Sequence, residues 1–236
     1  MTLLCLDAGN TRLKWGWRAD GRWLAQGACA TTAVETLVAA LPGRPTRIVA
    51  CNVAGDAVAG RIAALAAGLG APLDWFRSGA AAHGVINGYA DPVRLGDDRW
   101  AALIGARGLH AGHALVVMSG TATTIDILDA TGRFAGGLIL PGLALMRDAL
   151  ARNTAGLPEA RGGFREIPTN TDDAIASGAV QATLGAIERM ARRAAGTDFL
   201  CLLSGGDAPL LAPLLDLPLR QVDNLVLEGL ARAAEK

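Results

Sequence analysis

The 236-residue sequence has few aromatic side chains and no excess of charge of either sign. Aromatic residues make up 4% of the chain, and 22 basic residues are balanced by 22 acidic ones. Proteins that bind nucleic acid usually combine a basic surface with aromatic side chains for base stacking. We therefore expect no nucleic acid partner and no attraction to an acidic membrane surface. A small-molecule substrate is the expectation that remains.

Long apolar runs and patterned cysteines are also missing. No stretch reaches the roughly 20 apolar residues that span a bilayer, and Asp7 interrupts the first apolar run. We expect neither a membrane span nor an export signal, and hence a cytoplasmic protein. Cys5, Cys29, Cys51 and Cys201 show no CxxC spacing and lie in or beside apolar segments. This pattern indicates buried thiols rather than a zinc site or a disulfide framework.

The chain opens with an apolar segment that ends in a polar turn. Residues 3–6 predict a buried strand, and Asp7, Ala8, Gly9, Asn10 and Thr11 follow it directly. Gly9 lets the backbone approach a ligand closely, and the N–H groups of such a turn can point at phosphoryl oxygens. Asp7 can hold a hydrated Mg²⁺ through its water shell, because Mg²⁺ loses water reluctantly. The turn therefore predicts a phosphate site.

The same pattern recurs 111 residues later, where Gly120 stands in the position of Gly9. At this offset, residues 21–23 (Gly-Arg-Trp) pair with residues 132–134 (Gly-Arg-Phe). Each half predicts a strand, a glycine turn, a second strand and a hairpin turn into a third strand. We interpret the chain as two copies of one α/β unit, with domains at residues 1–112 and 113–236.

A second informative stretch is Gly96, Asp97, Asp98 and Arg99, which precedes an apolar helix. One acid can cap the helix, which contributes about 1 kcal/mol, and the sequence leaves open which one. The other acid is a candidate for a ligand cleft, with Arg99, whose planar guanidinium suits a carboxylate or phosphate. Asn52, at the end of a predicted strand, is a further cleft candidate.

Three later features concern a ligand or a partner. Residues 153–170 are polar and rich in Pro and Gly, and are a candidate lid or subunit contact. A helix is predicted from Thr171 to about residue 195, so Thr171 is either its N-cap or a cleft residue. A buried strand at residues 199–204 ends in Gly205 and Gly206. A nucleoside can pack against these glycines because no side chain stands in the way.

Together these motifs resemble those of the type III pantothenate kinases, members of the acetate and sugar kinase/Hsp70/actin superfold, over nearly the whole chain. The matching segments are residues 7–11, residues 96–99 (the GxDR motif), residues 120–124 with Asp126, residues 136–142, residues 170–171 and residues 204–208. The resemblance implies an α/β fold of two duplicated actin-like ATPase domains with an interdomain active-site cleft. It also implies ATP-dependent, Mg²⁺-dependent phosphorylation of pantothenate in coenzyme A synthesis.

The resemblance further implies the residues that serve the reaction and a homodimer whose partner helps to build the pantothenate site. Asp98 matches the catalytic base. The ATP-binding positions are Asp7, Ala8, Gly9, Asn10, Thr11, Arg12, Leu13, Lys14 and Thr121, to which the glycines after the last buried strand add Gly205 and Gly206. The pantothenate-binding positions are Tyr89, Gly96, Asp97, Asp98, Arg99 and Thr171.

Met118 departs from the family pattern, in which an Asp at this position helps to hold a monovalent cation, potassium or ammonium. A thioether is a poor ligand for a hard cation. Ser119, Thr121 and backbone carbonyls are neutral oxygens and would compensate only in part. We therefore expect a weakened cation site. The alternative function is a weakly active or inactive kinase-fold protein that acts as an accessory or regulatory factor; a kinase for another acyl or sugar acceptor is a second alternative.

Overall fold

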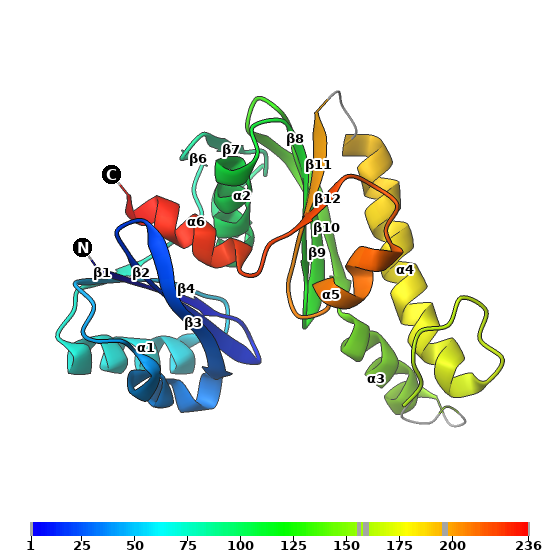
Figure 1. Cartoon of the computed structure of the whole chain (residues 1–236), viewed down its shortest axis with the longest axis horizontal. Helices are drawn as coiled ribbons and strands as arrows, with labels where there is room; N and C mark the ends of the chain where they lie inside the picture. Colours follow the sequence, from blue (N-terminus) through cyan, green and yellow to red (C-terminus); the bar gives the residue numbers. More distant parts are fainter. Residues whose placement is uncertain (1, 155–156, 158–160, 195–197, 236) are drawn as a thin grey trace. The chain divides into compact units, whose positions relative to one another are not determined.

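The structure, a computed structural model, describes residues 2–154, 157, 161–194 and 198–235. It is a mixed α/β protein that divides into two compact units (Figure 1). The first unit comprises Met1–Leu109, Gly132–Phe134 and Asn224–Lys236, and the second comprises His110–Thr131 and Ala135–Asp223. The units group residues 132–134 and the C-terminal helix with the first half of the chain. The domain bounds expected from the sequence, 1–112 and 113–236, stay a prediction.

The fold contains two sheets, and the five strands of the first have counterparts in the same order in the second. The first has the order β3-β2-β1-β4-β5, with β2 antiparallel to β1 and β3, and β4 parallel to β1 and β5. Its strands are β1 (Thr2–Ala8), β2 (Arg12–Ala19), β3 (Arg22–Ala30), β4 (Arg47–Asn52) and β5 (Leu73–Trp75). The second sheet has seven strands in the order β12-β11-β8-β9-β10-β7-β6, in which β7 (Val85–Asn87) and β6 (Ala81–Ala82) extend it beyond β10. In this sheet β9 is antiparallel to β8, β11 is parallel to β8 and β12, and β7 is parallel to β10. Its other strands are β8 (His113–Ser119), β9 (Ala122–Leu128), β10 (Arg133–Pro141), β11 (Phe199–Ser204) and β12 (Leu219–Gln221).

The strand bounds confirm the internal repeat. β8 begins and ends 111 residues after β1, and β10 begins and ends 111 residues after β3. The two glycine turns differ by one residue, because residues 9–11 join β1 to β2 whereas residues 120–121 join β8 to β9. The first turn therefore offers one more backbone N–H group than the second.

Helices cover both faces of the first sheet (Figure 1). The 3₁₀ helix η1 (Thr31–Ala40) and α1 (Asp56–Leu69) pack on the face that carries Leu4 and Leu6. On the other face lies α6 (Leu225–Ala234), which packs against α2 (Asp97–Leu109). The two helices touch closely at Gly229, because a Cβ there would overlap the carbonyl group of Ala101.

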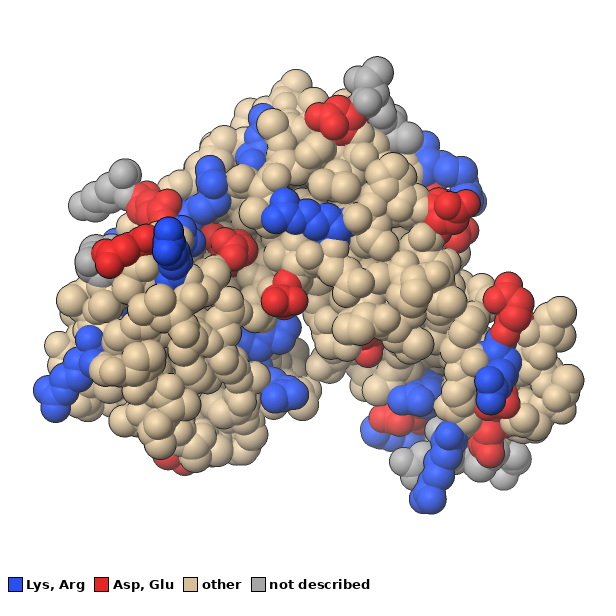
Figure 2. All heavy atoms as spheres, in the orientation of Figure 1, with Lys and Arg blue, Asp and Glu red and all other residues tan. Residues whose placement is uncertain are grey.

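In the second unit the core lies between the sheet and the helices α3 (Leu143–Asn153), α4 (Thr171–Ala194) and α5 (Ala208–Leu211), followed by η3 (Ala212–Leu214). Leu115, Val117, Ile187 and Leu203 are fully buried there. No helix among the residues described is both long and apolar enough to cross a bilayer. On the face drawn in Figure 2, acidic and basic side chains are interspersed over an otherwise uncharged surface.

Several expectations are refined by the structure. The segment expected to be a loop before Tyr89 contains β6 (Ala81–Ala82) and β7 (Val85–Asn87), and η2 (Pro92–Arg94) follows. Three cysteines are buried as expected, whereas Cys29 is half-buried. The candidate lid at residues 153–170 is described only in part, since residues 155–156 and 158–160 lie outside the described residues.

Candidate active site

Asp7 lies buried at the carboxyl end of β1. It is opposite Lys14 on β2 and Cys51 on β4, so the three side chains share one face of the first sheet. The Cys51 thiol donates a hydrogen bond to Asp7 Oδ1, with 3.4 Å between sulfur and oxygen. Burial raises the pKa of Asp7 to about 6; the charge of Lys14 opposes this shift and the charge of Asp98 adds to it. The first phosphate turn therefore begins with a buried carboxyl group whose pKa is raised.

Asp97 and Asp98, the first two residues of α2, have different surroundings. Asp97 accepts hydrogen bonds from the Ser78 backbone N–H and from Arg77 Nη1, both at 2.8 Å. Asp98 is half-buried, and its Oδ1 accepts the backbone N–H of Arg99 at 2.8 Å. Burial raises the pKa of Asp98, whereas this hydrogen bond and the charge of Arg99 lower it. Asp97 is thus engaged with a loop, which leaves Asp98 as the candidate base.

Gly96 provides space for the Asp98 carboxylate. The N–H of Trp100 donates to the Gly96 carbonyl at 2.9 Å, so the helical bonding of α2 starts from this residue. A Cβ at Gly96 would lie 2.6 Å from Asp98 Oδ1, closer than real contacts allow. A side chain at this position would have to displace the carboxylate.

Arg99 is 5% exposed and lies against two aromatic rings. Its Nη1 donates a hydrogen bond to the Tyr89 hydroxyl at 2.8 Å. Its guanidinium carbon lies 5.6 Å from the ring centroid of Tyr89 and 5.7 Å from that of Phe134. Of the expected pantothenate-binding residues, Tyr89, Gly96, Asp97, Asp98 and Arg99 therefore form one cluster in the first unit.

The eight expected ATP-binding residues from Asp7 to Lys14 differ in exposure. Ala8 and Leu13 are fully buried in the core of the first unit, so only their backbone groups are available to a ligand. Asn10, Thr11 and Arg12 are exposed. The Gly9 N–H donates to the Arg12 carbonyl at 3.1 Å and closes the turn.

The second phosphate turn is supported by glycines in close backbone contact. Gly205 has φ +107°, and a Cβ there would overlap the backbone of Ser119. The Gly142 N–H donates to the Thr121 carbonyl at 2.9 Å. Gly206 has open space beside it. Gly205 therefore allows β11 to end against the turn that carries Thr121, in the second unit.

Met118 occupies in the second sheet the register position that Asp7 occupies in the first. It is opposite Thr124 on β9 and Ser204 on β11. The Thr124 hydroxyl is buried, and within the described part of the chain it has no hydrogen-bond partner. Ser119, which we expected to compensate only in part for the missing carboxylate, hydrogen-bonds Thr123 at 2.9 Å and Asp207 at 3.3 Å. The side-chain oxygens on the two strands that pair with Met118 are thus the neutral hydroxyls of Thr124 and Ser204.

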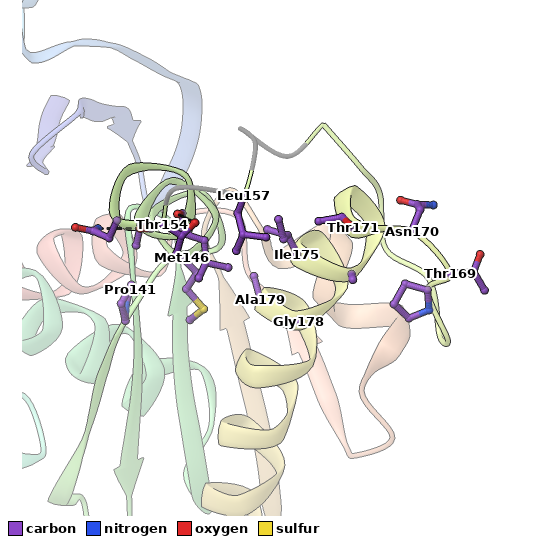
Figure 3. A pocket seen from close by; sticks show the side chains of 15 residues that line it. Pro141, Met146, Thr154, Leu157, Thr169, Asn170, Thr171, Ile175, Gly178 and Ala179 are labelled. Carbon is purple, nitrogen blue, oxygen red and sulfur yellow. Dashed lines mark hydrogen bonds between the residues drawn. The ribbon is translucent and has the colours of Figure 1, made fainter.

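Thr171 starts α4 and lines a cavity of about 1120 Å³ in the second unit. Asn170 fills the role of N-cap, because its Oδ1 accepts the N–H of Asp173 at 2.9 Å. Met146, Leu157 and Ile175 surround the same space (Figure 3). Asn170, rather than Thr171, is therefore the N-cap of α4, and the cleft role is the alternative that remains for Thr171.

Sequence reasoning missed Phe134 and Cys51 as neighbours of the site. The repeat offset pairs Phe134 with Trp23, but no local signal places its ring beside Arg99. Asn52, a cleft candidate, instead bonds the carbonyl of Gly55 at 2.9 Å and the N–H of Ala54 at 3.0 Å. These contacts make it part of a local turn.

Comparisons with known proteins agree with the resemblance. The sequence pattern described as "Type III pantothenate kinase" matches residues 3–193. A protein of that name from Aromatoleum aromaticum is 52% identical over 238 residues, which cover 99% of this chain and 98% of the relative. The family expectation is therefore confirmed.

Solved structures show the same fold. A Campylobacter jejuni protein assigned to the Baf family of transcriptional activators has a TM-score of 0.65 at 20% identity, covering 97% of this chain and 96% of its own. A Sinorhizobium meliloti protein assigned as a 2-dehydro-3-deoxygalactonokinase has a TM-score of 0.62 at 18% identity and covers 98% of both chains. The expected duplicated kinase fold is confirmed. By its sequence over most of its length, this chain belongs to the type III pantothenate kinase family.

Proposed function

We propose that this chain transfers the γ-phosphoryl group of ATP to the terminal hydroxyl of pantothenate, the first step of coenzyme A synthesis. Family membership supports the reaction. The surroundings of Asp98 support its assignment as the general base. As the hydroxyl oxygen attacks the γ-phosphorus, Asp98 accepts the hydroxyl proton. The new O–P bond forms while the bond to the β–γ bridging oxygen breaks, and ADP leaves.

The remaining residues align and neutralise the reactants. The exposed turn after Asp7 presents N–H groups to phosphoryl oxygens, and Lys14 supplies a positive charge beside Asp7. Asp7, a buried carboxylate that accepts a hydrogen bond from a thiol, fits a Mg²⁺ ion that keeps its waters. Bound Mg²⁺ would neutralise phosphate charge. Among the described residues, no group of three or more His, Cys, Asp or Glu side chains is arranged to hold a metal ion.

The decisive experiment is to incubate the purified chain with ATP, Mg²⁺ and pantothenate and to measure phosphopantothenate by mass spectrometry. We expect ADP and phosphopantothenate to form in equal amounts. Nucleotide binding without product would instead support the accessory-factor alternative, which the family match does not favour. We also propose a cytoplasmic protein. Because its 22 acidic residues balance its 22 basic ones, we propose no nucleic acid or membrane partner.

The surroundings of Met118 predict an unusual response to monovalent cations. A cation there would meet the neutral oxygen of Thr124 rather than a carboxylate, so we expect activation only at high potassium or ammonium concentration. Met118→Asp should shift half-activation to a lower cation concentration by about tenfold or more, because a unit charge about 4 Å away contributes about 1 kcal/mol in water and about 4 kcal/mol near a protein surface. The measurement is a titration of each cation against product formation at constant ionic strength.

Met118→Asn is the matched control, since it adds an oxygen ligand without charge. Its half-activation should stay close to that of the parent. Tight activation of the parent at millimolar potassium, unchanged by Met118→Asp, would show that the cation is held elsewhere.

We also propose a homodimer formed through the second unit. Large apolar side chains are exposed on β10 and α3 and on the segment that follows α3: Leu138, Ile139, Leu145, Leu150 and Ile167. Leu150 lines the same cavity as Thr171, and Ile175 lies beside Thr171 there (Figure 3). Exposed apolar area of this kind marks an interaction surface. A second copy on this surface would lie next to Thr171, as a shared pantothenate site requires.

Sedimentation equilibrium should give twice the chain mass for the parent. Leu150→Asp should weaken the dimer by about tenfold or more, because it places a charge in an apolar contact. Val38→Asp, a change of another exposed apolar residue in the first unit, is the control and should leave the dimer intact. A monomeric parent would contradict this proposal without affecting the assignment of Asp98.

A further inference from the structure

Arg99 and the rings of Tyr89 and Phe134 form a compact three-residue cluster, which we term the Arg99 clamp. The ring centroids lie 5.4 Å apart at an interplanar angle of 34°, and the guanidinium carbon lies within 5.7 Å of both. Phe134 is completely buried, whereas Tyr89 is half-buried. The phenylalanine ring therefore packs on the buried side of the cluster.

One buried residue, Asn87, links the backbones of Tyr89 and Phe134. Asn87 on β7 is paired with Phe134 in parallel register, and its Oδ1 accepts the N–H of Tyr89 at 3.1 Å. Its Nδ2 donates to the carbonyls of Pro92 at 3.0 Å and Gly79 at 3.1 Å. The backbones of both aromatic residues are thus held at the same short strand, although Phe134 follows Tyr89 by 45 positions.

Arg99 lies at a position that disfavours its positive charge. It lies in the first turn of α2, where the helix dipole disfavours a positive charge. A buried guanidinium also needs compensation for its lost hydration, and aromatic faces supply it through cation–π attraction. An arginine that is already immobile loses less conformational entropy when it meets an anion.

We propose that Phe134 is a positioning residue that holds the Arg99 guanidinium in place for an anionic group of the reactants. This proposal rests on the proposed function, in which Arg99 serves the pantothenate site. The anion is either the pantothenate carboxylate or the phosphoryl group in transfer, and kinetics distinguish the two. An effect on the KM for pantothenate indicates the carboxylate, and an effect on kcat indicates the phosphoryl group.

The test is a double-mutant cycle between Phe134→Leu and Arg99→Lys. Leucine keeps an apolar side chain but removes the aromatic face, and lysine keeps the charge but not the planar fork. We expect Phe134→Leu to lower kcat/KM about tenfold in the parent and hardly at all in the Arg99→Lys background. Equal losses in both backgrounds would overturn the proposal, because Phe134 would then act independently of Arg99.

Two controls separate positioning from stability. Phe134→Met places a longer, more adaptable apolar side chain of similar volume to leucine at this position, and it should match the kinetic loss of Phe134→Leu if the aromatic face matters. Phe199→Leu, at a half-buried position in the core of the second unit, makes the same change away from Arg99 and should leave kcat/KM unchanged. A loss in Phe199→Leu equal to that in Phe134→Leu would contradict a specific role.

A measurement without substrate tests the clamp separately from the proposed function. Tyr89 is the single tyrosine of the chain, so ¹³C-labelled tyrosine gives one ring environment in the NMR spectrum. We expect Phe134→Leu and Arg99→Lys each to shift or broaden this signal, and Phe199→Leu to leave it unchanged. An unchanged Tyr89 signal in Phe134→Leu would refute the clamp even if the kinase activity is confirmed. If the parent fails to phosphorylate pantothenate, the function fails while this result still stands.

Discussion

Asp98→Asn is expected to reduce kcat about 10²–10⁴-fold, the range for loss of a general base. The amide that replaces the carboxylate cannot accept the proton of the attacking hydroxyl. Burial raises the pKa of Asp98, which makes its carboxylate a better proton acceptor. Its Oδ1 already accepts the Arg99 N–H, a contact that the Asn side-chain oxygen can keep. Steady-state kinetics with saturating ATP and pantothenate measure the loss.

Asp97→Asn is the matched control, since it makes the same chemical change one residue away. Asp97 bonds the Ser78 N–H through one oxygen and Arg77 through the other, and Arg77 is largely exposed. Loss of an exposed ion pair costs little stability. We expect turnover within a fewfold of the parent. Equal kinetic losses in both variants, with unchanged melting temperatures, would show that the base is not Asp98.

Asp7→Asn is expected to reduce Mg²⁺-dependent turnover on the order of 10²-fold, because it removes the charge that would hold the hydrated ion. The KM for pantothenate should change far less, since the Arg99 clamp is untouched. The measurement is kcat as a function of Mg²⁺ concentration at saturating ATP. Unchanged turnover at saturating Mg²⁺ would exclude Asp7 from the mechanism.

The same substitution should stabilise the metal-free protein. The pKa of Asp7 rises from its usual 3.8 to about 6 in the folded state, so the folded state binds this proton more tightly than the unfolded state. Stability therefore falls as pH rises from about 4 to about 6, and the cost persists at higher pH. Asp7→Asn should remove up to about 2–3 kcal/mol of this cost at pH 8.

Thermal unfolding with EDTA and no nucleotide, at pH 4 and pH 8, tests this linkage. The gain from Asp7→Asn should appear at pH 8 and nearly vanish at pH 4, where Asp7 is protonated. Asp97→Asn should show no such gain. A destabilised Asp7→Asn at pH 8 would mean that the carboxylate is needed for the fold, contrary to the expected trade between stability and activity.

Local patterns in the sequence are sufficient to predict the repeated strands, but not β6 and β7, which add to the second sheet. The apolar runs before Asp7 and before Ser119 predict β1 and β8, and the constant offset predicts that β3 and β10 correspond. Such predictions succeed because strand periodicity and glycine turns depend on neighbouring residues. The motif at residues 96–99 likewise identifies the charged cluster at the start of α2, because its residues are contiguous in the chain.

Tertiary contacts decided what each polar residue does. A loop 19 residues upstream engages Asp97 and leaves Asp98 available, and Asn170 takes the cap that the sequence left open for Thr171. Phe134, which the repeat places on a strand of the second copy, packs beside Arg99 in the first unit. The sequence could not decide these points, because two adjacent acids, or an adjacent amide and hydroxyl, fit the same local pattern. Their roles depend on hydrogen-bond partners and rings that only the folded chain brings within reach.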